Sequence, residues 1–483
     1  MKICMLLEGC YPYVRGGVSA WTHNYIHAFH GDEFVLWTVC TDRASAGKFK
    51  YELPENVSAV HEVFLSDAYG IDKNGSHIKS VRAGRKFRSS AEVEAALLRL
   101  FKCENPDWER LFAFFGRRRM RSADFLKSEF FFDLTAALCC GLFPHSPFAD
   151  VYYSVSSMAL PLVHMLTQRP PEADIYHAIA TGYCGVLGAL GSYRYKKPLI
   201  VSEHGIYTRE REEEILRAKW AIPYLKDLWI AHYYMLSRCA YDAAVHVTCL
   251  FEHAREIQIK LNCPPEKTSV IANGIIFSRF SEIAPKKADG FIDIGAVVRI
   301  APIKDIKTMI YAFSELKYSV PNARLHILGD TDDAAYGAEC RQLVSYLKTE
   351  DVFFTGNTNV EKYFEKLDFT ILTSISEGQP LAVLESMAAA RPVVSTDVGS
   401  CRELIETGPG DGLGHCGFVC PPMDPGALAA AMKRMCTNEG RRLRMGETGR
   451  ERVRRSYQQE TMIMKYAKLY DKSLKRVKHR WPE

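Results

Sequence analysis

Short apolar runs rich in β-branched residues alternate with amphipathic stretches along the whole of this 483-residue chain. The apolar runs have the length of strands, about 4–8 residues, and the stretches between them are long enough for helices. This alternation predicts βαβ units, and therefore α/β domains with parallel, doubly wound sheets. The strand candidates are residues 3–7, 34–39, 174–178, 199–202, 243–248, 291–298, 325–328, 352–354, 369–372 and 393–396.

The length of the chain predicts two such domains, because one domain usually holds about 100–200 residues. A polar segment without periodicity, residues 281–290, separates the two sets of strand candidates and is the best linker. We therefore expect a Rossmann-like domain over residues 1–285, with a mostly helical elaboration at about 70–170, and a second one over residues 290–456. Residues 457–483 contain a long final helix with apolar residues on one face.

The composition is that of an ordinary globular protein, and it argues against several other classes. A formal net charge of +5 is mild for this length and does not predict a nucleic-acid partner. No apolar run reaches the roughly 18–20 residues that cross a bilayer, and the first apolar run is too short for a signal-peptide core. The 15 cysteines are scattered, which favours free thiols in a reducing, cytoplasmic setting.

The final helix has a basic end. Two interpretations remain open, a solvated surface or a peripheral contact with anionic lipid at the inner membrane face. The cations concerned are Lys472, Lys475, Arg476, Lys478 and Arg480.

Two short motifs have the residue types of metal sites without the full pattern. His415, Cys416 and Cys420 lack a second ligand pair at zinc-ribbon spacing. Asp330 and Asp332 mimic a D-x-D motif, but they follow a strand candidate where a turn is needed, and acidic residues are common in turns. We therefore expect neither a metal nor another cofactor.

Two carboxylates, Glu377 and Glu385, flank the junction between a strand candidate and a helix that Pro380 can begin. A helix start offers unpaired amides and the positive end of the helix dipole to an anion. Carboxylates beside it can accept hydrogen bonds from sugar or ribose hydroxyls. The candidate ligand-binding residues of this segment are Glu377, Gly378, Gln379, Leu381, Ala382 and Glu385.

Two further segments have the residues of a phosphate site. Arg299 ends a strand candidate and Lys304 follows five residues later, so both cations are expected at the mouth of one strand. A guanidinium gives directed hydrogen bonds to phosphate and an ammonium gives a point charge. Near the N-terminus, Gly16 and Gly17 lie in a loop between a strand and a helix, where glycines allow a ligand to approach the backbone.

Three more positions follow strand candidates or lie in them. His204 closes one strand, at the edge where active-site residues of such sheets lie. His177 is either a residue that lines the acceptor side or a buried histidine. Gly356 and Asn357 follow another strand and can offer backbone groups to a ligand.

In their order along nearly the full length, these elements resemble the GT4 family of retaining glycosyltransferases with the GT-B fold. The matching motifs are the Gly16-Gly17 loop, His204, the Arg299-x4-Lys304 pair and the E-x7-E pair Glu377 and Glu385. The resemblance implies two Rossmann-like domains facing a central cleft, with residues 457–483 crossing back to pack on the first domain.

The resemblance also implies roles. Arg299 and Lys304 would neutralise the departing nucleoside diphosphate, with the Gly16-Gly17 loop facing it. Glu377 would hold the donor sugar, Glu385 the nucleotide ribose, and His204 a sugar hydroxyl. Gly356 and Asn357 would contact the base.

The segments E-G-C-Y-P-Y-V-R-G-G-V-S and E-G-Q-P-L are similar to the members of the family that act in Pel exopolysaccharide biosynthesis. That similarity implies a UDP-sugar donor, UDP-glucose first, a glycan acceptor and an inner-membrane polysaccharide synthesis complex as partners. Two departures stand out: the usual G-R-L segment reads Val298-Arg299-Ile300, and Asp305 stands where many relatives have glycine.

The sequence therefore leaves three functions open. The first is metal-independent hexosyl transfer without an enzymic nucleophile. The second is a GT-B nucleotide-sugar epimerase, which shares the architecture but not the full set of motifs. The third is a non-catalytic nucleotide-sugar-binding subunit of a polysaccharide assembly complex.

Overall fold

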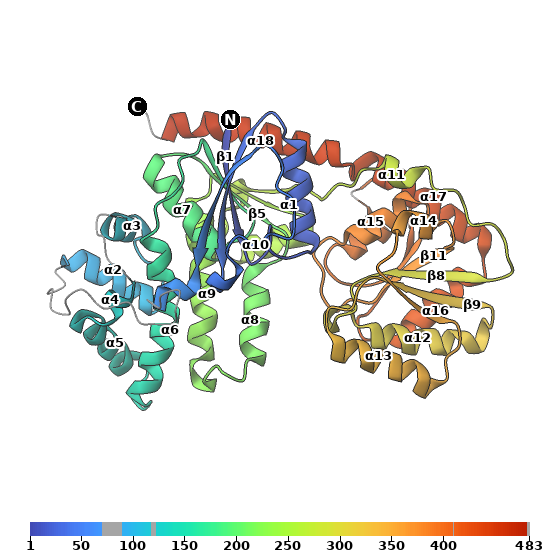
Figure 1. Ribbon diagram of the computed structural model, residues 1–483, viewed down its shortest axis with the longest axis horizontal. Helices are drawn as coiled ribbons and strands as arrows, with labels where there is room; N and C mark the ends of the chain where they lie inside the picture. Colours follow the sequence, from blue (N-terminus) through green and yellow to red (C-terminus); the bar gives the residue numbers. More distant parts are fainter. Residues whose placement is uncertain (70–88, 117–121, 409, 481–483) are drawn as a thin grey trace. The chain divides into compact units, whose positions relative to one another are not determined.

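The computed structural model describes residues 1–69, 89–116, 122–408 and 410–480. The chain divides into two compact units, each built on one sheet (Figure 1). Unit 1 consists of Met1–Cys249, Ala254–Val270 and Ala467–Glu483, and unit 2 of Leu250–His253 and Ile271–Tyr466. The predicted fold class, two doubly wound α/β domains with parallel sheets, is confirmed.

The sheet of unit 1 has seven strands in the order β3-β2-β1-β4-β5-β6-β7, and each neighbouring pair is parallel. The strands are β1 (Lys2–Glu8), β2 (Glu33–Cys40), β3 (Val57–Phe64), β4 (Ile175–Ala178), β5 (Leu199–Glu203), β6 (His246–Cys249) and β7 (Thr268–Val270). The central strands β4 and β5 are buried throughout, as their continuous apolar runs predict. The strand order reverses between β1 and β4.

Two groups of helices belong to unit 1. The first alternates with the strands: α1 (Gly17–Ala28), α7 (Tyr183–Tyr195), α8 (Tyr207–Arg217), α9 (Lys226–Ala243) and α10 (Glu252–Lys260). The second lies between β3 and β4: α2 (Ala91–Phe101), α3 (Trp108–Gly116), α4 (Ser122–Leu126), α5 (Glu129–Leu142) and α6 (Phe148–Leu166). This second group forms a separate cluster beside the sheet (Figure 1). It occupies the described part of the expected elaboration, of which residues 70–88 and 117–121 lie outside the description.

The sheet of unit 2 has six strands in the order β10-β9-β8-β11-β12-β13, again with parallel neighbours. The strands are β8 (Ile292–Val297), β9 (Ala323–Leu328), β10 (Val352–Gly356), β11 (Phe369–Leu372), β12 (Val393–Thr396) and β13 (Gly417–Cys420). The strand order reverses between β8 and β11.

Helices cover both faces of this second sheet (Figure 1). One face carries α12 (Ile306–Ser319), α13 (Ala334–Leu347) and α16 (Pro425–Cys436), and the other α14 (Val360–Phe364), α15 (Leu381–Ala388) and α17 (Glu439–Ser456). The short helix α11 (Ser278–Ser281) precedes β8.

The final helix, α18 (Gln459–Arg480), begins in unit 2, and its part from Ala467 onward belongs to unit 1. In unit 1 its Tyr470 is fully buried. The Tyr25 hydroxyl donates to the Tyr470 oxygen over 2.6 Å, and Nδ1 of His177 lies 2.6 Å from the same oxygen. A buried hydrogen-bond network therefore joins the end of the chain to α1 and β4.

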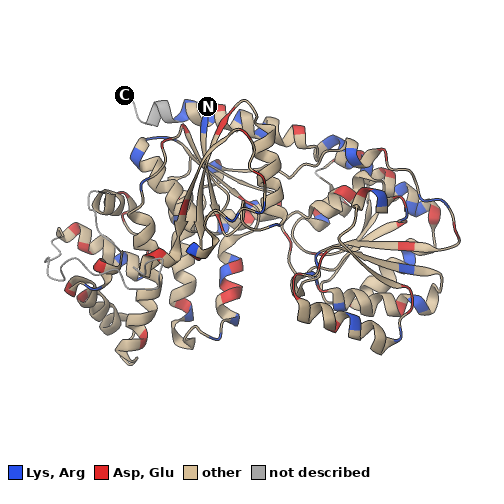
Figure 2. Ribbon diagram, in the orientation of Figure 1, with Lys and Arg blue, Asp and Glu red and all other residues tan. Residues whose placement is uncertain are grey.

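Two general properties bear on localisation and partners. Among the described residues, no helix combines the length and the apolar character that a membrane crossing requires. Charged residues of both signs are interspersed over both units (Figure 2). The side chains of Lys478 and Arg480, two of the cations at the basic end, lie outside the description.

A cluster of charges in unit 2 surrounds Asp293 of β8, whose side chain is 1% exposed. Its carboxylate pairs with Lys286 at 2.5 Å, Arg324 at 2.6 Å and His326 at 2.7 Å. Burial raises the pKa of Asp293, but the hydrogen bonds from His326, Arg324 and Lys286 outweigh it and hold that pKa below its usual range. Because Lys286 precedes β8, the cluster fixes the start of unit 2's sheet.

Replacing Asp293 by Asn should destabilise the protein by about 3–5 kcal/mol at pH 7, because the surrounding cations lose their buried partner. The pKa of the native carboxylate is lowered, so its stabilisation is present above the unfolded value of about 4 and is lost as the pH falls below it. The wild-type advantage over Asp293→Asn should therefore shrink between about pH 5 and pH 3. Urea denaturation of both proteins across this range tests the prediction, and equal stability at pH 7 would contradict it.

Candidate active site

The loops that follow β8 and β11 meet where the strand order of unit 2 reverses. The Ile375 amide donates to the Ile303 carbonyl over 2.9 Å. The buried Thr373 hydroxyl lies 2.9 Å from the carbonyl of Lys304 and 3.1 Å from that of Asp305. These bonds hold the two loops together at a switch point, the place where open α/β sheets bind ligands.

The side chains of Lys304 and Glu377 form an ion pair across this point. Lys304 Nζ lies 2.5 Å from Glu377 Oε1, and the Ser374 hydroxyl donates to the same oxygen over 2.5 Å. The side chains of Lys304 and Glu377 are only 18% and 12% exposed, so solvent screens the pair weakly. The structure thus brings together the cation and the carboxylate that the sequence placed in separate motifs.

Arg299 lies after the end of β8 and pairs with Asp332. Both side chains are well exposed, 52% for Arg299 and 38% for Asp332. The middle residue of the D-x-D motif, Thr331, forms a parallel β-bridge with Ile300, and the Ile300 amide donates to the Asp330 carbonyl over 2.9 Å, so the motif is held against the loop after β8. The sequence did not predict the contact with Arg299, since 33 residues separate the two partners.

Asp305 explains how the Lys304 turn forms without glycine. Its backbone is left-handed, with φ of 46°, the conformation in which glycine is favoured and Asp is tolerated. Its carboxylate also accepts a hydrogen bond from the Thr308 amide over 3.3 Å and so caps α12. The departure from the usual sequence therefore preserves the turn.

Helix α15 begins at Leu381, directly after Pro380, so the amides of Leu381 and Ala382 lead the helix as expected. Glu385 lies one turn further on. Burial raises the pKa of Glu385 to about 7, opposed by the charge of Arg279 and assisted by that of Glu361. Near neutral pH this carboxyl therefore exchanges between its acceptor and its donor form.

Gly378 and Gln379 connect the two carboxylates and are tied to neighbouring segments. The Gly378 carbonyl accepts a hydrogen bond from the Ser400 amide over 2.9 Å. The Gln379 side chain is 6% exposed, and its oxygen accepts a hydrogen bond from the Asn273 amide over 2.6 Å. The side-chain oxygen of Gln379 is therefore already bonded to the 273 segment. A contact between Gln379 and a nucleotide sugar would have to come from its backbone.

Gly356 ends β10, two strands from β8 along the same edge, with φ of 66°. Its carbonyl accepts a hydrogen bond from the Gly329 amide over 3.0 Å. Asn357 follows as an exposed residue. The structure places this pair at the carboxyl edge of the sheet that carries Arg299.

In unit 1, Gly16 and Gly17 stand at the start of α1. A Cβ atom built on either residue would meet no other atom within 4 Å. The packing of the protein itself therefore does not require glycine at these positions, and the space above the backbone is open.

His204 follows β5, and its ring packs edge-on against Trp21 with centroids 4.3 Å apart. Burial lowers the pKa of His204 to about 4, so the imidazole is neutral at pH 7. Its Nε2 is buried and finds no hydrogen-bond partner among the residues that the structure describes. An orphaned buried nitrogen is costly, and a ligand hydroxyl would satisfy it.

His177 matches the second of its two interpretations, a buried histidine. Its Nδ1 lies 2.6 Å from the Tyr470 hydroxyl and its Nε2 2.7 Å from the Ser202 hydroxyl. Burial lowers the pKa of His177 to about 3. These two protein partners explain the presence of His177 without a contact to an acceptor substrate.

The cysteines of the rejected zinc motif face the core of unit 2. The Cys416 thiol donates to the Ile405 carbonyl over 3.3 Å, and the Cys420 thiol to the Ala427 carbonyl over 3.5 Å. In the described ranges, no three His, Cys, Asp or Glu side chains gather as a metal ion would need.

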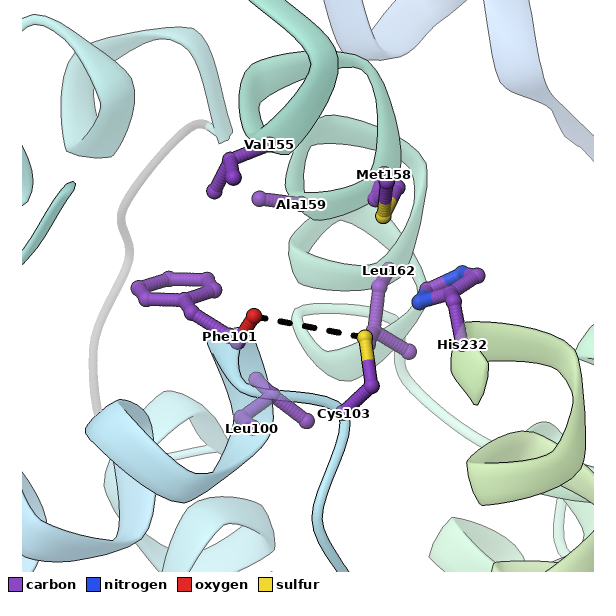
Figure 3. Close-up of a pocket in the computed structure, with 8 residues that line it drawn as sticks. All are labelled: Leu100, Phe101, Cys103, Val155, Met158, Ala159, Leu162 and His232. Carbon is purple, nitrogen blue, oxygen red and sulfur yellow. Dashed lines mark hydrogen bonds between the residues drawn. The ribbon is translucent and has the colours of Figure 1, made fainter. Parts of the chain in front are cut away.

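A separate pocket lies in unit 1 between α2 and α6 of the helical cluster and α9 (Figure 3). Its polar groups are the His232 ring, whose pKa burial lowers to about 4, and the Cys103 thiol, 4.0 Å from the Phe101 carbonyl. The residues that line it are Leu100, Phe101, Cys103, Val155, Met158, Ala159, Leu162 and His232. Without a charged side chain in its wall, this pocket lacks the groups that hold a diphosphate.

Comparisons with known proteins also point to the candidate site of unit 2. Residues 292–438 match the family model described as glycosyl transferases group 1. This match spans all six strands of unit 2's sheet, and the two parallel sheets together have the GT-B fold. Residues 1–266, more than half of the chain, match the model described as domain of unknown function DUF3492, and the chain belongs to that family.

Individual relatives are distant. The chain is 22% identical to MMP alpha-(1->4)-mannosyltransferase of Mycolicibacterium hassiacum, over 66% of this chain and 76% of that protein. It is 29% identical to the putative colanic acid biosynthesis glycosyltransferase WcaL of Salmonella typhimurium, over 43% of this chain and about half (52%) of WcaL. HepE of Anabaena, solved in complex with UDP, shares the fold with a TM-score of 0.60 and 15% identity, over 98% of this chain and 100% of HepE.

Proposed function

We propose that the protein is a retaining hexosyltransferase that moves a sugar from a UDP-sugar, UDP-glucose first, to a growing exopolysaccharide or other glycan. One observation carries the proposal: Lys304 and Glu377 meet in an ion pair at the switch point of unit 2. Arg299 lies at the end of the adjoining strand, and the leading amides of α15 follow Glu377 in the same loop. This set supports the proposal because it combines cations that suit a diphosphate with a carboxylate that can accept hydrogen bonds from a sugar.

In the proposed reaction, Arg299 and Lys304 stabilise the charge that develops on the diphosphate as the glycosidic bond breaks. Glu377 then accepts hydrogen bonds from the donor sugar, and Glu385 from the ribose hydroxyls. For unit 1 we keep the roles that the family resemblance implies, a hydrogen bond between His204 and a sugar hydroxyl and an anion contact for the Gly16-Gly17 loop. No metal ion takes part in this scheme.

The donor and the pathway rest on similarity. HepE was solved with UDP and with UDP-glucose, and WcaL is named for colanic acid, a polysaccharide. The E-G-Q-P-L segment and the first loop resemble PelF, the glycosyltransferase of Pel exopolysaccharide biosynthesis. We therefore place the protein in Pel-type synthesis, in the cytoplasm, with an inner-membrane synthesis complex as partner.

The other candidate functions differ in what they do with a bound donor. A non-catalytic subunit would bind the UDP-sugar without transfer, and an epimerase would change the sugar and leave it on the nucleotide. Calorimetric titration with UDP-, GDP- and ADP-sugars in EDTA, followed by product analysis, tests all three. Binding of UDP-glucose with release of UDP supports transfer, whereas absence of binding to any nucleotide sugar would exclude the donor site.

Replacing Glu377 by Gln separates binding from transfer. We expect the rate of UDP release from UDP-glucose, measured with a membrane extract as acceptor, to fall about a hundredfold, equivalent to about 3 kcal/mol. The dissociation constant of UDP should change by less than about threefold, because Lys304 remains available to the phosphates. Glu339→Gln, an exposed change on α13 that removes the same charge, is the matched control. Unchanged turnover of Glu377→Gln would contradict the role of this residue.

Glu385 should make binding of the nucleoside pH-dependent. Because burial raises its pKa to about 7, the carboxylate that accepts the ribose hydroxyls is lost as the pH falls from about 8 to about 6. Uridine affinity, followed by NMR, should therefore weaken severalfold over this range in the wild type and stay flat in Glu385→Gln. Uridine is chosen because it has no phosphate that titrates there. A flat wild-type profile would contradict the assignment.

A further inference from the structure

The loop after β9 is unusually acidic for a neighbour of a diphosphate site. Asp330, Asp332 and Asp333 follow β9 directly and are exposed. The Asp333 carboxylate caps α13 by accepting a hydrogen bond from the Tyr336 amide over 2.9 Å. Asp332 instead pairs with Arg299, so this cation of the candidate site, like Lys304 with Glu377, is engaged with a carboxylate.

The backbone holds Asp332 within reach of Arg299. Ile300 and Thr331 form a parallel β-bridge, and the Asp332 amide donates to the Ile300 carbonyl over 3.2 Å. One residue before this loop, a Cβ on Gly329 would lie 2.1 Å from the Val298 carbonyl oxygen, so the loops after β8 and β9 are closely apposed. When the Arg299 side chain turns to another anion, the Asp332 carboxylate therefore stays beside it.

We propose that Asp332 is a stand-in anion for the donor diphosphate. In the empty site its carboxylate is paired with the Arg299 guanidinium. In the filled site it is displaced but remains near the phosphates, where its charge opposes theirs. The residue therefore lowers the affinity for UDP and speeds its release, and it acts through Arg299 rather than by touching the reacting atoms. This inference rests on the proposed function, since it requires that Arg299 binds the diphosphate.

The exposure of the pair makes the exchange feasible. Ion pairs between well-exposed side chains contribute little stability, because water and salt screen them. A nucleoside diphosphate brings more negative charge than one carboxylate and can bond the guanidinium fork in two places. Arg299 can therefore change partners readily, and Asp332 adjusts the affinity without blocking the site.

The test is UDP binding to the full-length protein with Asp332→Asn. Asp330→Asn is the matched control, because it removes the same charge two residues away from the Arg299 contact. We expect Asp332→Asn to bind UDP about three- to tenfold more tightly at low salt and to release it more slowly. Asp330→Asn should differ from the wild type by less than about twofold. Calorimetry gives the affinity and stopped-flow displacement the release rate.

Two further measurements separate this role from a structural one. The increase in UDP affinity that Asp332→Asn produces should be smaller at about 0.5 M salt, where charges at a protein surface are screened. The gain in UDP affinity should also be smaller in an Arg299→Gln background, where the competition for the guanidinium is absent and only the repulsion between Asp332 and the phosphates remains. A purely structural role would lower the thermal midpoint of Asp332→Asn and would not tighten binding.

Each outcome decides the inference. If the wild type binds UDP and Asp332→Asn binds it equally or more weakly, Asp332 is not a competitor and the inference is overturned while the proposed function stands. If neither protein binds UDP or any UDP-sugar, the proposed function fails and the inference fails with it. An equal increase in UDP affinity in Asp330→Asn would also overturn it. The loss of any negative charge from the loop would then explain the tighter binding.

Discussion

The reversal of strand order between β8 and β11 is the constraint on which the candidate site depends. Two strands that are distant in the sequence become neighbours there, and their loops diverge from the same edge. Thr373 and Ile375 close the gap by bonding the backbone of residues 303–305, and this closure sets Lys304 against Glu377. A cation and a carboxylate 73 positions apart thus become one group.

The switch points of the two sheets differ in how their charged side chains are paired. In unit 1 the order reverses between β1 and β4, and Glu8, at the end of β1, accepts hydrogen bonds from the Cys184 amide and the Tyr207 hydroxyl, each over 3.1 Å. Burial raises the pKa of Glu8. The protein's own carboxylate thus lies at the start of α7. At the switch point of unit 2, Lys304 is held by the mostly buried Glu377, whereas Arg299 is met by the exposed Asp332, which can turn away when an anion arrives.

The sequence predicted the buried strands well and the exposed ones poorly. The run 369–372 became the buried strand β11, whereas β3 was not predicted: polar residues interrupt its sequence, and only its last two residues are buried. Strand β7, with three residues, is too short to carry a pattern, and the four residues of β13 begin with a glycine, which weakens the strand signal. Pairing within the sheet, rather than local propensity, decides these elements.

For the candidate site, local motifs predicted which residues lie at the carboxyl edge, but not what each side chain contacts. The turn at Asp305 depends on one left-handed residue, which the sequence alone left uncertain. The Gln379 bond to Asn273 and the Arg299 pair with Asp332 join segments 106 and 33 residues apart, so no local pattern could indicate them.

The placement of charge within unit 2 separates stability from binding. In the Asp293 cluster, Lys286, Arg324 and His326 surround the buried Asp293 carboxylate, so removal of that carboxylate would leave charges in a poorly solvated environment. The pair formed by Arg299 beyond the other end of the same strand is exposed and can be exchanged at little cost. A single strand, β8, therefore has a fixed ionic network near its start and an adjustable one beyond its end. This arrangement lets side chains at the edge reorganise around an anion while the sheet that positions them stays unchanged.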